Sequence, residues 1–197
     1  MSSLTFVFFG IVGSGKGTQV KLLTDFLKSH DGRPCVYAGT GEGFRSIVDS
    51  GSYAGELLKE KMHKGELIED FFANSIIANT LSTHISPEKN LILDGYPRTV
   101  EQSKVFETMM KFFKHDDVKI IYIEVGKEEA MKRNLLRGRS DDTEEGIAKR
   151  FDEYVNNVVP AMNYFKDKKG YKIYTINGEQ SVEEVHKDII DKLGFRS

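Results

Sequence analysis

The chain of 197 residues has no tryptophan, four prolines and one cysteine, Cys35. A single cysteine excludes an internal disulfide and a cysteine-rich zinc site, and this usage is typical of a reducing compartment, so we expect a cytoplasmic protein. The apolar stretch near the start, LTFVFFGIVG, is too short to cross a bilayer and has no basic leader. We therefore expect neither a signal peptide nor a membrane anchor.

An excess of positive charge is also missing. The formal net charge is −2 and the sequence pI is about 6.2. The chain therefore offers no global basic field for nucleic acid or an anionic membrane, and we expect neither as a partner. Any polyanion must be bound by locally concentrated charge. With 39% hydrophobic and 29% charged residues, the composition is that of one ordinary globular domain.

Short apolar runs alternate with segments of helical period, such as VKLLTDFLK and VEEVHKDIIDKL. The runs predict five strands, at Leu4–Phe9, Cys35–Tyr37, Asn90–Leu93, Val118–Val125 and Tyr171–Ile176. This alternation favours an α/β fold, with a five-stranded parallel sheet flanked by helices in three layers. Capping-box patterns predict helix starts at Thr99, Asp142 and Ser181. Two segments interrupt the alternation: the glycine-rich, mostly helical residues 39–68 and the short charged LRGRSDD at 136–142.

Residues 10–18, GIVGSGKGT, follow a predicted strand and precede a predicted helix. That context is required of a phosphate-binding loop, in which glycines let successive N–H groups point inward and the helix N-terminus favours an anion. Lys16 then supplies a full positive charge to the β- and γ-phosphates. The alternative is a glycine-rich turn with an exposed lysine. In the common motif Ser or Thr follows the lysine directly, whereas here Gly17 intervenes and the hydroxyl belongs to Thr18.

Five motifs occur in order along the chain: GSGKGTQ at 13–19, TGEGFR at 40–45, KGELI at 64–68, LDGYPRTVEQ at 93–102 and RGRSDDTEEGIAKRF at 137–151. With them the sequence resembles the adenylate kinase family of nucleoside monophosphate kinases over almost its whole length. The resemblance implies the P-loop nucleoside-triphosphate-hydrolase-like fold and a monomer. It implies reversible, Mg²⁺-dependent phosphoryl transfer from ATP to AMP, giving two ADP.

The resemblance divides the single kinase domain into a core (1–38, 69–135 and 143–197), an AMP-binding insert (39–68) and a short lid (136–142). It assigns ATP binding to Gly13, Ser14, Gly15, Lys16, Gly17, Thr18, Arg133, Arg137 and Gln180. It assigns AMP binding to Thr40, Arg45, Glu66, Leu67, Ile68, Gly95, Tyr96, Arg98, Gln102, Arg139 and Arg150. Lys16, Asp94, Arg98, Arg139 and Arg150 would serve catalysis, and Asp141 and Asp142 would hold the lid closed.

Several of these residues have a second interpretation. Asp94 would orient Mg²⁺ through water, but a carboxylate at a strand end can also cap a turn. Gln102 would bind the adenine edge of AMP, or serve as the capping-box partner of Thr99. Asp141 and Asp142 precede a helix, where acids are favourable for dipole reasons alone. The arginines between 133 and 150 could form a solvated basic face.

The sequence also departs from the family pattern. Ile11-Val12 stands where Gly-Pro is usual, Glu42-Gly43 where Asp and leucine are usual, and Gln180 where a small residue is common. The lid is shorter than in short-lid relatives, so we expect faster opening and more loss of phosphoryl groups to water. Two other functions stay open: a UMP/CMP kinase, against which Thr40 and Gln102 argue, and a P-loop switch, which would not need the AMP-side arginines.

Overall fold

A computed structural model describes residues 3–137 and 143–195. Its strands are β1 (Thr5–Phe9), β2 (Cys35–Gly39), β3 (Asn90–Asp94), β4 (Val118–Glu124) and β5 (Tyr171–Asn177). Its helices are α1 (Lys16–His30), α2 (Thr40–Asp49), α3 (Tyr53–Lys64), α4 (Asp70–His84), α5 (Val100–Phe113), α6 (Lys127–Arg137), α7 (Glu144–Glu153), a π-helical turn (Tyr154–Val158), α8 (Val159–Asn163) and α9 (Val182–Leu193). The five predicted strands are confirmed to within two residues at each end.

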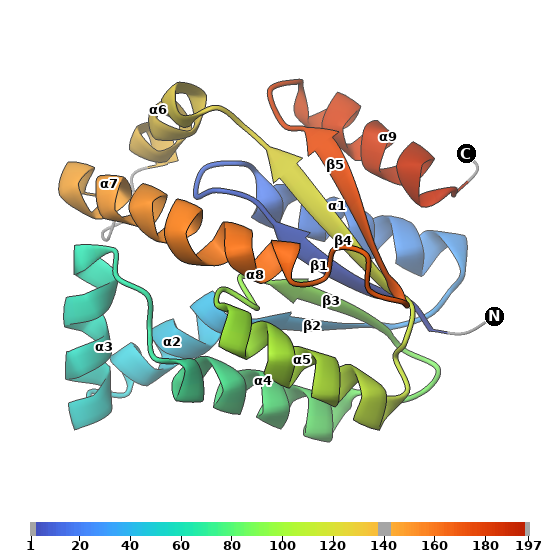
Figure 1. The fold of residues 1–197 in the computed structure, drawn as a ribbon, viewed down its shortest axis with the longest axis horizontal. Coiled ribbons are helices and arrows are strands. Elements are labelled where there is room, and N and C mark those ends of the chain that lie inside the picture. The colour runs from blue at the N-terminus through green and yellow to red at the C-terminus, as the bar shows by residue number, and fades with distance from the viewer. Residues whose placement is uncertain (1–2, 138–142, 196–197) are drawn as a thin grey trace.

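The strands form one parallel sheet in the order β2-β3-β1-β4-β5. The central strand β1 pairs with β3 on one side, where Thr5 is opposite Leu91, and with β4 on the other, where Thr5 is opposite Val118. Helices cover both faces of the sheet, which gives three layers (Figure 1). A central strand covered on both faces is expected to be almost wholly apolar. All five residues of β1 are buried, and four of them are apolar.

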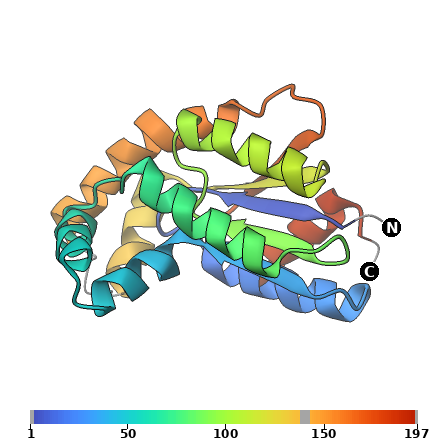
Figure 2. The same cartoon turned by 90° about the horizontal axis from the view of Figure 1, so that it is seen from below.

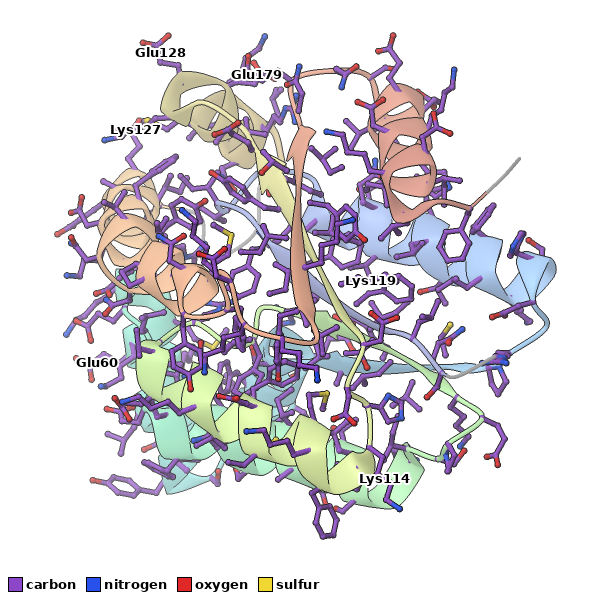
Figure 3. The ribbon with its side chains drawn as sticks, turned by 45° about the vertical axis from the view of Figure 1, so that its right-hand side comes forward. Glu60, Lys114, Lys119, Lys127, Glu128 and Glu179 are labelled. Carbon is purple, nitrogen blue, oxygen red and sulfur yellow. The ribbon has the colours of Figure 1, made fainter. Side chains whose placement is uncertain are left out.

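Alternate residues of β1 enter two separate cores, because side chains of a strand point to opposite faces in turn. Val7 and Phe9 belong to the core under α4, α5 and α8. Phe6 and Phe8 belong to the core under α1 and α9. Figure 2 shows the same layers from below, with α4 and α5 on the opposite side of the sheet from α1. Charged side chains such as Glu60, Lys114 and Glu128 project outward (Figure 3).

The helix starts follow the predicted caps with one correction. Ser181 and Glu184 form the complete reciprocal capping box of α9. The Thr99 side chain accepts a hydrogen bond from the Gln102 backbone N–H, as predicted for α5. The prediction of Asp142 as the cap of α7 is wrong by one residue, because the side chain of Thr143 accepts from the Gly146 N–H. A threonine hydroxyl serves this purpose as an aspartate does.

The region 39–68 contains α2 and α3 and is mostly helical, as predicted. No helix within residues 3–137 or 143–195 combines the length and apolar character needed to span a bilayer. Because the sheet is parallel, the loops that follow all five strands emerge at one edge. The phosphate-loop motif follows β1, Gly95 follows β3 and Gln180 follows β5, while Thr40 begins α2 directly after β2.

Candidate active site

A cavity of about 1250 Å³ opens at the carboxyl edge of the sheet. Ligands of open α/β sheets bind at this edge, since the loops there leave a crevice between them. The predicted site residues that line it are Gly13, Gly15, Lys16, Gly17, Thr18, Arg45, Glu66, Leu67, Ile68, Asp94, Gly95, Tyr96, Arg98, Arg133, Arg150 and Gln180. The fold therefore brings together residues that are more than 160 positions apart in the chain.

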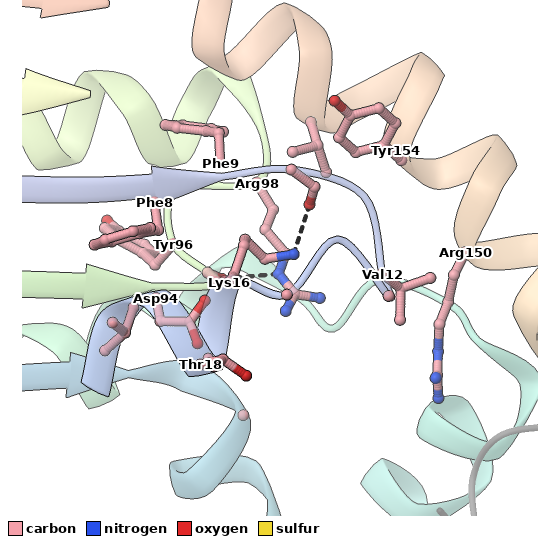
Figure 4. Close-up of a pocket in the computed structure, with 18 of the residues that line it drawn as sticks. Phe8, Phe9, Val12, Lys16, Thr18, Asp94, Tyr96, Arg98, Arg150 and Tyr154 are labelled. Atoms are coloured by element: carbon pink, nitrogen blue, oxygen red, sulfur yellow. Dashed lines mark hydrogen bonds between the residues drawn. The ribbon is translucent and has the colours of Figure 1, made fainter. Parts of the chain in front are cut away.

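The phosphate loop connects β1 to α1 and closes around the ammonium group of Lys16. Lys16 Nζ donates hydrogen bonds to the carbonyl oxygens of Gly10 (2.7 Å) and Ile11 (2.9 Å). Figure 4 shows this lysine beside Asp94 and Arg98 in the cavity. Gly15, at φ 87°, is the N-cap residue of α1 and has no side chain to satisfy the first helical N–H groups. These N–H groups and the ammonium therefore form a site for an anion.

The loop after β3 holds a partly buried arginine. Arg98 Nε donates to the carbonyl of Gly95 (2.8 Å), and the same carbonyl accepts from Thr40 Oγ1 (2.8 Å). Burial lowers the pKa of the Arg98 guanidinium, while Asp94 raises it and Arg150 lowers it further. Arginine remains charged even so. A desolvated cation next to a second cation is stabilised by an anion, so this part of the cavity suits a phosphate.

One wall of the cavity combines α6 with the loop after β5. Arg133 Nε donates to Glu129 Oε1 (2.7 Å), and Arg133 Nη1 donates to the carbonyl of Gly178 (2.9 Å). Gln180 is fixed in a similar way, since its Nε2 donates to the Asn177 carbonyl (3.1 Å) and to Asp188 Oδ2 (2.8 Å). Both side chains, which the resemblance assigns to ATP binding, are thus held in place by the protein itself.

The opposite wall is built by α2, α3 and α7. Arg150, on α7, extends toward α3 (Figure 4), and its Nη2 donates to the carbonyl of Met62 (3.2 Å). Arg45 on α2 and the segment Glu66–Ile68 line the same space. Cationic side chains therefore face the phosphate loop across the cavity.

Three predicted residues, Ser14, Thr40 and Gln102, are buried and do not contribute to the lining. Gln102 is 2% exposed. Its Oε1 accepts from the Arg98 backbone N–H (2.8 Å), and its Nε2 donates to Asp70 Oδ1 (2.8 Å). The amide therefore braces the turn that carries Arg98. Its predicted contact with the adenine of AMP stays a prediction.

The remaining predicted residues are Arg137, which ends α6, and Arg139, Asp141 and Asp142, which lie outside the described residues.

Asp94 and Thr18 both line the cavity beside the phosphate loop. Among residues 3–137 and 143–195, no three His, Cys, Asp or Glu side chains gather as a metal site, so the protein offers no complete coordination shell there. A hard divalent cation that arrives with phosphates and keeps its waters needs only one or two protein oxygens. One carboxylate and one hydroxyl fit such an ion.

The parallel sheet, the phosphate loop after its central strand and the cationic walls define a P-loop phosphotransferase. The comparisons with known proteins agree: the family model for adenylate kinase matches residues 8–170. An adenylate kinase of Thermosipho africanus is 32% identical, over 95% of this chain and 98% of its own. An adenylate kinase of Prochlorococcus marinus is 32% identical over 95% of this chain and 97% of its own. Adenylate kinase 1 of Nostoc is 30% identical, also over 95% of this chain and 97% of its own. The chain belongs to the adenylate kinase family and is a nucleoside monophosphate kinase.

Sequence reasoning missed two residues that hold the site together. Glu129 positions Arg133 and lies four residues before it on the same helix, so i,i+4 spacing could have identified it. Asp70 accepts from both Thr99 and Gln102. Because Asp70 is on α4 and its partners are about 30 residues later, no local pattern indicates this contact.

Proposed function

We propose that the protein catalyses reversible phosphoryl transfer from Mg·ATP to AMP, giving two ADP. The observation that supports this most directly is that one cavity joins a phosphate loop to a facing set of arginines. Its volume of about 1250 Å³ exceeds the roughly 300–1,000 Å³ of sites for one small ligand. A cavity of this size with cations on both walls has room for two nucleotides and offsets the charge of both.

The side chains act by binding and positioning. Lys16 and the N–H groups at the start of α1 hold the β- and γ-phosphates of ATP, and Arg133 and Gln180 flank its base. Arg45 and Arg98 hold the AMP phosphate so that one of its oxygens lies in line with the γ-phosphate. Arg150 and Arg139 reach the transferring group. The expected rate enhancement comes from alignment and from charge stabilisation in a water-poor site, without a covalent protein intermediate.

Thr18 and Asp94, which line the same cavity, would hold Mg²⁺. Asp94 would hold it through water, and the ion would offset charge on the β- and γ-phosphate oxygens. We further propose that residues 39–68 are the AMP-binding insert and residues 136–142 the lid of a single kinase domain. We also propose that the protein works as a monomer, as the resemblance implies, in the cytoplasm, which its single cysteine supports. Its net charge of −2 supports a function without nucleic acid or membrane partners.

A coupled assay of ADP formation tests the function. ATP is supplied with AMP, UMP, CMP or GMP in parallel, with and without Mg²⁺, and once without acceptor. We expect fast, Mg²⁺-dependent turnover with AMP and at most slow turnover with the others. Faster turnover with UMP or CMP would leave the fold and the catalytic residues in place but contradict the choice of acceptor. ADP formation at the same rate with and without an acceptor would identify an ATPase and contradict the proposal.

A further inference from the structure

Asn134, on α6, has a polar side chain that is buried completely, with 0% exposure. Its neighbours Leu135 and Leu136 are 52% and 79% exposed, so at this point the helix turns an amide rather than a leucine toward the protein. Asn134 Nδ2 donates to the carbonyl of Ala130 (2.8 Å) in its own helix and to the carbonyl of Val12 (3.0 Å) in the phosphate loop. Helix α6 therefore holds the loop directly.

The carbonyl that Asn134 holds belongs to the central peptide of a tight turn. The Ser14 N–H donates to the Ile11 carbonyl (3.1 Å), which closes a four-residue turn. Its third residue, Gly13, has φ 85°, as a type II turn requires. Type I and type II turns differ in the orientation of their central peptide, here the one that joins Val12 to Gly13. A hydrogen bond to the Val12 carbonyl therefore favours one of the two orientations.

The orientation of that peptide also directs the N–H of Gly13. In a trans peptide the carbonyl and the following N–H point in opposite directions. Since the Val12 carbonyl points to α6, the Gly13 N–H points away from α6. We propose that Asn134 is a positioning residue of the phosphate loop: it orients the Val12–Gly13 peptide so that the Gly13 N–H is available to the phosphates of ATP.

The fit around Gly13 supports this role. A Cβ added to Gly13 would lie 2.6 Å from Asn134 Nδ2, so the amide lies directly against the loop backbone. Asn134 Oδ1 is buried and has no hydrogen-bond partner, although such an acceptor is unfavourable inside a protein. A leucine of similar size would fill the space without this defect. The contribution specific to the amide is its bond to the loop.

The same helix carries Arg133, which Glu129 and Gly178 hold at the cavity wall formed by α6 and the loop after β5. Through Asn134, the phosphate loop and this arginine are therefore held in one unit. The consequence is selective: loss of the Asn134 amide disturbs ATP binding, whereas the part of the site proposed for AMP, on α2, α3 and the loop after β3, does not depend on it.

The inference rests on the proposed binding of ATP at the loop, and Asn134→Leu tests it. We expect the Kd of a non-hydrolysable ATP analogue, measured without AMP, and the KM for ATP to rise about 10-fold or more. The KM for AMP should stay within about 2-fold and Tm within a few degrees. The exposed Asn79→Leu on α4 controls for the change in helix propensity. Asn134→Met gives the same measurement if the leucine variant does not fold.

Unchanged ATP binding in a folded variant would overturn the inference. So would equal losses for ATP and AMP together with a lower Tm, because these would indicate a general structural role. The wild-type protein separates this outcome from failure of the proposed function: if it does not bind the ATP analogue, the proposed function itself fails.

Discussion

Lys16 illustrates how one side chain can be prepared for a ligand. Its ammonium group already donates to the Gly10 and Ile11 carbonyls and to Ser14 Oγ, so its stem is held across the loop and a phosphate oxygen has only to replace one of these acceptors. A preorganised cation of this kind contributes more to a transition state than a mobile one, because the reorganisation is complete before the reaction.

We expect Lys16→Met to reduce kcat by about 10²-fold or more, because the variant keeps the length of the stem and loses the charge that offsets the transferring phosphoryl group. Thermal unfolding should show a Tm within a few degrees of wild type. Lys28→Met, at the exposed last turn of α1, is the control and should leave kcat unchanged. A Lys16→Met enzyme with normal kcat would contradict the phosphate-loop assignment.

At the scale of elements, the end of α3 lies against the start of α7. Gly65 is the C-cap of α3 at φ 72°, and a Cβ there would overlap the carbonyl oxygen of Gly146. Glycine thus serves two purposes at once: it allows the left-handed conformation and the close approach of the two helices. This contact fixes one side of the wall on which Arg150 and Glu66 lie.

Gly51 offers a matched control, because it has φ 64° but open space where a Cβ would lie. Gly51→Ala should lower Tm by about 2–4 °C, the effect of roughly 1 kcal/mol of left-handed strain. Gly65→Ala adds a backbone clash, so we expect a clearly larger fall in Tm and a higher KM for AMP. Equal falls in Tm and an unchanged KM would show that the α3–α7 approach is not needed.

At the scale of the whole molecule, Glu107 connects α5 to the segment before β5. Its Oε2 accepts hydrogen bonds from Tyr164 (2.6 Å) and Lys168 (2.7 Å). The hydrogen bond from Lys168, followed in size of effect by the one from Tyr164, lowers the pKa of Glu107 from 4.5 to about 2. A carboxyl group with a lower pKa in the folded state stabilises the fold above its unfolded pKa. That contribution is lost as the pH falls from about 4.5 to about 2.

Glu107→Gln should therefore lower Tm by about 2–4 °C at pH 7, since it removes the charge that both donors contact. The difference in Tm from wild type should shrink as the pH falls below 4.5, toward the Glu107 pKa of about 2. Melting curves between pH 7 and pH 2 measure it, with Glu88→Gln in an exposed turn as the control. A difference that stayed constant over this range would mean that the carboxylate charge contributes nothing.

Local sequence patterns were sufficient to predict the strands, the phosphate loop and part of the candidate site. The strands, the phosphate loop and the Ser181 cap follow from residues that are neighbours in the chain, since apolar runs, glycine spacing and caps describe contacts within a few positions. The parallel sheet then places the ends of all strands at one edge. For that reason the predicted residues Lys16, Asp94 and Gln180 line one cavity.

Other features depended on the tertiary structure. Gln102 donates to Asp70, which is 32 residues away, and Asn134 donates to Val12, which is 122 residues away. The apolar neighbours of Asn134, Leu135 and Leu136, are exposed instead. The sequence by itself determined which elements form and what chemistry each loop carries. Only the packing of α4 on α5 and of α6 on the phosphate loop decided which polar groups meet, because those partners come from segments that are far apart in the chain.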